Sequence, residues 1–182
     1  RLGAIEGAAS QVVIMLTSAA FLPAVGLGKA GTTLVGQSIG AGEYVWARRL
    51  GNRVIALSVI YMFLFGLLLA LFGQQLVALF IAPNDPSAQA LVALGAQLAL
   101  IAAFYQVFDG LHLGAVFCLR GAGDAKMPAL VLFVLSWGFF IPLTYVLTFA
   151  PGEGWFSYLP ALGYGAGGGW WAANVYMFVL SV

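Results

Sequence analysis

Three polar side chains share one helical face inside the long apolar run of residues 88–119. They are Tyr105, Asp109 and His112, spaced by four and then three residues, and such a spacing makes them neighbours on a helix. A carboxylate in this position can take up a proton, or it can hold a hard monovalent cation together with a tyrosine oxygen and backbone carbonyls. The sequence therefore predicts an ion- or proton-binding group at Asp109, with Tyr105 and His112 beside it.

A structural role is the alternative for each of these residues. Asp109 can form a hydrogen bond across helices, and His112 can simply orient Asp109. We favour function for Asp109, because ionisable residues inside a membrane are costly and are usually functional. For His112 we favour the structural role, and for Tyr105 both roles stay open.

Three neighbouring side chains are candidates for the wall of a substrate cavity. Phe104 and Phe108 can present ring faces to flat aromatic cations, although most phenylalanines in such a helix only pack. Gln106 lies three residues before Asp109 and can instead form a hydrogen bond to a neighbouring helix.

The composition places these residues in a membrane. Only 7% of the 182 residues are charged and 63% are hydrophobic, whereas a typical soluble domain is about 25% charged. Lys and Arg form no basic face, which argues against nucleic acid as a partner. His112 and Cys118 are the only residues of their types, so they make no zinc site. Without a nucleophile motif, a phosphate-binding glycine loop or a catalytic carboxylate pair, we expect neither an enzyme nor a cofactor.

Five apolar segments are long enough, at about 20 residues, to cross the bilayer as helices. They lie at about 8–39, within 54–84, and at about 88–119, 128–149 and 163–182. Pro23 and the glycines that follow it predict a bend in the first segment. The predicted fold class is an all-α integral membrane bundle of about five helices, with residues 1–182 as one membrane domain in the lipid bilayer.

The Lys and Arg residues predict the orientation of this bundle. Loops 40–53 and 120–128 contain five of them, whereas PNDPSAQA (83–90) and APGEGWFSYLPALGYG (150–165) contain none. Because basic loops stay in the cytoplasm, we expect loops 40–53 and 120–128 there, in a multi-pass protein of the inner (plasma) membrane. Asp109 then lies roughly 15 Å from the cytoplasmic end of its helix. A carboxylate at that depth costs about 2.5–3.5 kcal/mol and should face the bundle interior.

Two further charged groups have structural interpretations. Arg120 and Asp124 are expected to form a local ion pair at a helix end. Lys29 can extend toward the cytoplasmic interface, or it can face the cavity and repel cationic compounds.

Several segments resemble those of a known transporter family. TTLVGQSIGAGEYVWARRLGN (32–52) resembles the G-Q-x-x-G-A-G element, followed by A-R-R, of the multidrug and toxic-compound extrusion (MATE) transporters. FDGLHLGAVFCLRGAGDAKMP (108–128) resembles the family's L-R-G-x-G-D element followed by Pro. AFLPAVGLGKAGTTLVGQ, SWGFFIPLTYVL and GYGAGGGWWAA resemble other helices of the family, so the resemblance covers essentially the whole chain.

The resemblance implies helices eight to twelve of a twelve-helix, two-half transporter. Because the chain starts without Met and stops inside an apolar run, we expect a longer polypeptide that also holds the first helix of this half and the N-terminal half. In MATE transporters an acidic residue of the matching helix takes part in cation binding, which implies that role for Asp109. Tyr105 falls where the family can supply a further oxygen ligand. The implied function is antiport, in which organic, often cationic, compounds leave the cell in exchange for inward Na⁺ or H⁺.

Two other functions stay open. A lipid-linked-saccharide flippase of a related family shares the architecture, but it would favour a broad basic cavity for pyrophosphate, and only Lys29 lies near mid-membrane. An intramembrane enzyme could use Asp109 and His112 as acid and base, but the sequence offers no second catalytic carboxylate, nucleophile or metal set.

Overall fold

The computed structural model describes residues 3–82, 86–150 and 162–181. Within these ranges the chain is helical and contains no strand. The elements are α1 (Ala4–Gly40), α2 (Tyr44–Ala78), α3 (Ala88–Gly121), α4 (Lys126–Leu135), the π-helical turn η1 (Ser136–Phe140), α5 (Ile141–Thr148) and α6 (Gly165–Ser181). In the described part of the chain, α1, α2, α3 and the continuous α4–η1–α5 segment are long and apolar enough to span a membrane, and α6 has 17 residues. The predicted all-α membrane bundle is confirmed.

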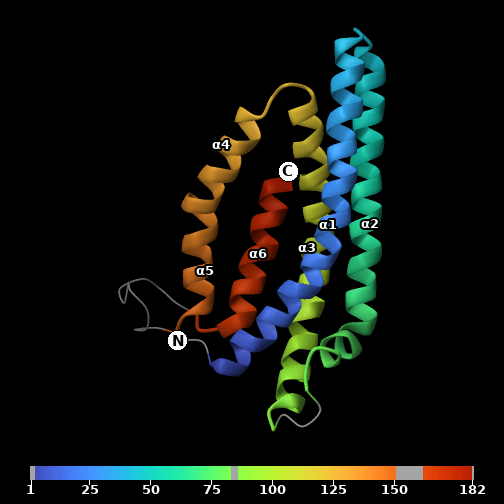
Figure 1. Ribbon diagram of the computed structural model, residues 1–182. Helices are drawn as coiled ribbons and strands as arrows, with labels where there is room; N and C mark the ends of the chain where they lie inside the picture. The colour runs from blue at the N-terminus through green and yellow to red at the C-terminus, as the bar shows by residue number, and fades with distance from the viewer. Residues whose placement is uncertain (1–2, 83–85, 151–161, 182) are drawn as a thin grey trace.

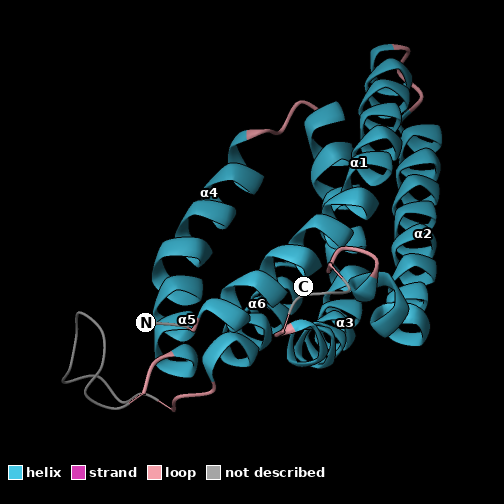
Figure 2. Cartoon of the chain, turned by 60° about the horizontal axis from the view of Figure 1, so that its bottom comes forward, coloured by secondary structure: helices cyan, strands magenta, loops and turns pink. Residues whose placement is uncertain are grey.

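The helices form a tight group of three with two further helical segments beside it. α1, α2 and α3 lie side by side, α6 packs against α3, and the α4–η1–α5 segment lies outside α6 (Figures 1 and 2). The turns between α1 and α2 and between α3 and α4 lie at the same end of the bundle (Figure 1). Both basic loops therefore lie at one end, which we call the basic end. Residues 83–85 and 151–161, in the loops predicted for the opposite side, are outside the described residues.

The first span is one unbroken helix that contains Pro23. Figure 1 shows the N-terminal part of α1 inclined relative to its C-terminal part. A proline inside a helix removes one backbone hydrogen bond, and its ring crowds the preceding turn. A bend without a break is the change of direction that the sequence predicts.

The fourth span is less regular than the sequence suggests. The predicted helix at 128–149 is present as α4–η1–α5, but its middle winds as a π-helical turn. Pro142 lies two residues after the end of this turn, at the start of α5. It has no N–H to donate, and in a regular α-helix its ring would collide with the carbonyl of Gly138. The wider turn relieves that collision, and such turns occur frequently at functional sites.

Small residues bring α2 and α3 into backbone contact. A β-carbon added at Gly66 would lie 2.7 Å from the carbonyl oxygen of Ala103, and one added at Gly110 would lie 2.8 Å from that of Ser58. Small residues at helix interfaces in membranes allow this close approach. The contact fixes the rotation of α3, and with it the direction in which Asp109 points.

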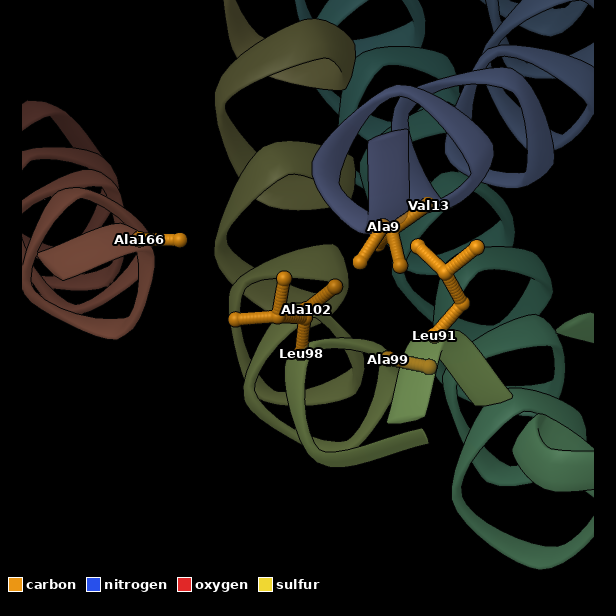
Figure 3. Packing of buried hydrophobic residues seen from close by; sticks show 7 residues of the cluster. All are labelled: Ala9, Val13, Leu91, Leu98, Ala99, Ala102 and Ala166. Carbon is orange, nitrogen blue, oxygen red and sulfur yellow. The ribbon is translucent and has the colours of Figure 1, made fainter. Parts of the chain in front are cut away.

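A second apolar contact joins α3 to the N-terminal part of α1 and to α6. Figure 3 shows side chains of α1 directed toward those of α3, with α6 on the other side of α3. The buried members of this cluster are Ala9, Val13, Leu91, Leu98, Ala99, Ala102 and Ala166. α3 is thus packed against α2, α1 and α6 and forms the centre of the bundle.

Candidate functional site

Asp109 lies on the wall of a cavity of about 640 Å³. Residues of α1, α3, α4, η1 and α6 line this space, which we call the Asp109 cavity. The carboxylate is only 6% exposed. Most of the wall is apolar, and its polar side chains are Asp109, His112, Arg120, Ser136 and Tyr176. The sequence prediction that the carboxylate faces the bundle interior agrees with this position.

The Asp109 carboxylate has no hydrogen bond or ion pair with any described residue. It is also the one carboxylate among the residues that line the cavity. A buried ionised group without a partner is strongly unfavourable. The chemistry of the site is therefore that of a group that needs a proton or a cation to become neutral.

Tyr105 lies one turn from Asp109 but has different neighbours. Its ring centre is 6.1 Å from that of Trp170 in α6, and its hydroxyl interacts with the Thr17 side chain of α1. Tyr105 is not among the residues that line the Asp109 cavity. The structure thus brings Tyr105 and Asp109 to successive turns of α3, and the role of Tyr105 as an oxygen ligand stays a prediction.

His112 lines the Asp109 cavity together with Asp109. Its ring donates a hydrogen bond to the backbone carbonyl of Leu180 in α6. This bond ties α3 to α6. The role favoured from the sequence, in which His112 orients Asp109, stays a prediction. A direct part in ion or proton binding stays a prediction.

The three candidates for the substrate cavity lie elsewhere on α3. Gln106 is 1% exposed and packs against α2 beside Gly66, and its Nε2 has no hydrogen-bond partner among the described residues. Phe104 is 60% exposed. Phe108 makes an edge-on ring contact with Phe178 at 5.3 Å between ring centres. Phe104 and Phe108 line an apolar groove of about 280 Å³ between α2 and α3, and none of the three candidates lines the Asp109 cavity.

The predicted ion pair between Arg120 and Asp124 is wrong within the described structure. Asp124 Oδ1 instead accepts a hydrogen bond of 3.0 Å from the backbone N–H of Met127, so this carboxylate caps the first turn of α4. The Arg120 guanidinium lies over the Phe117 ring, 5.4 Å from its centre, and Arg120 lines the Asp109 cavity. Arg120 is thus a member of the site that the sequence did not indicate.

Ser136 and Tyr176 are two further members of the site that were not predicted. Their hydroxyl oxygens are 2.8 Å apart, which joins η1 to α6 across the cavity wall. The sequence signal for this contact is indirect, because Pro142 only marks the irregular turn that holds Ser136.

Lys29 is exposed and does not line the cavity.

Comparison with known proteins settles the family. The family model MatE matches residues 1–146. The chain belongs to the MatE family. It is 36% identical over 170 residues to the probable multidrug resistance protein NorM of Pseudomonas putida. That alignment covers 93% of this chain and 34% of the relative. It is 38% identical over 153 residues to the multidrug resistance protein NorM of Burkholderia vietnamiensis, and this alignment covers 84% of the chain and 33% of the relative.

A third NorM relative, from Pseudomonas syringae pv. tomato, is 32% identical over 182 residues, which is 100% of this chain and 37% of that protein. The chain thus spans about a third of the length of these relatives. Membership of the MatE family places the chain in a family of multi-pass inner-membrane transporters and not of enzymes, which confirms the resemblance stated from the signature segments.

The two segments that carry the family resemblance, 32–52 and 108–128, contact each other at the basic end. Thr32 Oγ1 donates a hydrogen bond of 2.8 Å to the Phe117 carbonyl. A β-carbon added at Gly121 would lie 2.5 Å from the Thr32 carbonyl oxygen, and one added at Gly36 would lie 3.2 Å from the Gly121 oxygen. The crossing of α1 and α3 thus leaves no room for a side chain at Gly121 and little room at Gly36.

Proposed function

We propose that this chain forms part of a secondary antiporter that exports organic, often cationic, compounds in exchange for inward Na⁺ or H⁺, and that Asp109 binds the coupling ion. The observation that carries the proposal is the burial of Asp109 on a cavity wall without a partner among the described residues. Membership of the MatE family and relatives named multidrug resistance proteins support the export of drug-like compounds.

The proposed cycle follows from the cost of burying charge. Asp109 takes up the ion when the cavity opens to the outside, because the bound ion or proton neutralises the buried carboxylate. Neutralisation changes which helix arrangement is favoured, and the arrangement with bound ion releases the exported compound. Coupling requires that ion and compound bind with different affinities in the two arrangements.

The α4–η1–α5 segment is the proposed moving part. It lies across the Asp109 cavity from α3, and neither α4 nor η1 contains a buried residue. Its π-helical turn before Pro142 lacks the regular hydrogen-bond pattern of an α-helix. Such a segment can change its position at a smaller energetic cost than α3, which is packed against three helices.

An isosteric substitution tests the role of Asp109. The intact protein is reconstituted into vesicles, and efflux of a fluorescent organic cation is driven by an imposed Na⁺ or pH gradient. Asp109→Asn should abolish gradient-driven efflux and leave the amount of folded protein in the membrane unchanged. Whichever gradient drives the wild-type protein identifies the coupling ion.

Glu43→Gln is the matched control, because it removes an exposed carboxylate at the start of α2. We expect this variant to transport like wild type. Wild-type efflux by Asp109→Asn would contradict the assignment, as would an equal loss in both variants.

A further inference from the structure

A second cavity, of about 430 Å³, lies at the basic end between α1, α2 and α3. We call it the basic-end cavity. Its wall is mostly apolar, with Val35, Ile39, Ala47, Gly51, Ile55, Ala115, Cys118, Leu119 and Ala122, and its polar side chains are Tyr44, Arg48 and Asn52. None of these residues belongs to the Asp109 cavity.

The polar side chains form a stripe along one face of α2. Tyr44, Arg48 and Asn52 follow each other at intervals of four residues, which places them above one another on the helix. The stripe is about 12 Å long at 1.5 Å per residue. All three side chains are exposed, so they are accessible at the edge of the apolar wall.

Arg48 is the charged member of the stripe, and its charge is not neutralised. It has no ion pair or hydrogen bond with a described residue, and the described residues that line the cavity include no carboxylate. The neighbouring Arg53 differs, because its guanidinium lies over the Trp46 ring, 5.8 Å from the ring centre. An arginine with free donors beside an apolar pocket is suited to a phosphate group, which it can bind through two parallel hydrogen bonds.

The surroundings of the cavity suit the surface of a membrane. Tyr44 is 70% exposed and Trp46 is 44% exposed, and such aromatic side chains favour the boundary between lipid tails and headgroups. Loops 40–53 and 120–128 carry five Lys or Arg residues against two carboxylates, Glu43 and Asp124. This excess of positive charge attracts acidic lipids of the facing leaflet.

We propose that the basic-end cavity binds one acidic phospholipid from the leaflet at this end of the bundle. Arg48 binds the lipid phosphate, and Tyr44 and Asn52 contact its polar headgroup. The apolar wall between α1 and α3 accommodates the start of an acyl chain. Free phosphate would use only Arg48 and leave the apolar wall exposed, and an organic cation would be repelled by the guanidinium.

Native mass spectrometry of the intact protein tests this site. The protein in detergent is titrated with phosphatidylglycerol, and in a parallel series with phosphatidylethanolamine of the same acyl chains. The wild-type protein should retain one phosphatidylglycerol more strongly than the others. Arg48→Ala should weaken that first binding step on the order of tenfold more than Arg49→Ala does, because bidentate hydrogen bonds are lost as well as charge.

Arg49→Ala is the matched control, because Arg49 is an exposed arginine one residue along α2 that does not line the cavity. Equal weakening by the two substitutions would overturn the proposal, since it would show only diffuse attraction to the basic end. Equal binding of phosphatidylglycerol and phosphatidylethanolamine would overturn it too.

Cys118 supplies a second, local measurement, because its thiol lies on the cavity wall. Phosphatidylglycerol should slow maleimide labelling of Cys118 in the wild-type protein but not in Arg48→Ala, with Cys118→Ala correcting for other thiols. Inorganic phosphate at the same concentration should leave labelling unchanged. Protection by phosphate equal to that by lipid would replace the lipid site with a simple anion site, and a lack of protection by lipid would overturn the location.

Discussion

Gly110→Ala tests whether the backbone contact with α2 holds α3 in place beside Asp109. A β-carbon at position 110 would lie 2.8 Å from the Ser58 carbonyl oxygen and 2.9 Å from the Met62 β-carbon, whereas ordinary contacts begin at 3.4 Å. The Ser58 oxygen belongs to the backbone and cannot rotate away. The helices must therefore separate by roughly 0.6 Å, the difference between 3.4 and 2.8 Å.

The expected cost is that of overpacking a helix interface, typically about 1–3 kcal/mol. Gly26→Ala is the matched control, because a β-carbon at position 26 meets no described atom within 4 Å. Both substitutions lie inside helices, so both gain the same preference of alanine over glycine for the helix. The difference in stability between the two variants isolates the steric term at Gly110.

Thermal unfolding of the intact protein in detergent, followed by tryptophan fluorescence, provides the measurement. In a soluble chain of 150–250 residues, each kcal/mol shifts the midpoint by about 2–4 °C. We expect Gly110→Ala to unfold at least about 2 °C below Gly26→Ala. Equal midpoints for the two variants would refute the argument that α2 and α3 are in backbone contact at this level.

Two hydrogen bonds give further predictions for the same unfolding assay. Ser136→Ala and Tyr176→Phe should each lower the free energy of unfolding by about 1 kcal/mol, and the double variant should lose no more than one of them, because both remove one bond of 2.8 Å. Fully additive losses would show that the two hydroxyls act separately. Asp124→Ala should cost about 1 kcal/mol through loss of the cap on α4. The loss of unfolding free energy on Asp124→Ala should be the same when Arg120 is already replaced by alanine. A smaller loss in that background would be evidence for an ion pair between Arg120 and Asp124.

The helices of this bundle were predictable because a membrane-spanning helix is indicated by the length of an apolar segment alone. A span needs only about 20 apolar residues, and every predicted span has a helical counterpart in the structure. The π-helical turn was not predictable in the same way, because Pro142 disturbs the helix but does not specify how the chain accommodates it. Pro23 illustrates the difference, since α1 remains a continuous α-helix around it.

The sequence predicts the order of the candidate residues along α3, but not which side of the helix each of them faces. A helix turns about 100° per residue, so Gln106 and Asp109 lie only about 60° apart around the axis. The sequence cannot say which of the two faces α2, because that depends on packing. The glycine contacts at Gly66 and Gly110 fix the rotation that buries Gln106 against α2 and turns Asp109 toward the cavity.

The same rotation leaves α3 with two unlike sides, which bears on how an ion at Asp109 could act. On one side, glycine contacts hold α3 against α2 without room for movement. On the other side the cavity separates Asp109 from the α4–η1–α5 segment, whose α4 and η1 portions contain no buried residue. A change of charge at Asp109 can displace a neighbouring helix cheaply only where few packed contacts must break. Ion binding should therefore move the α4–η1–α5 segment relative to α3 and leave the α2–α3 pair unchanged.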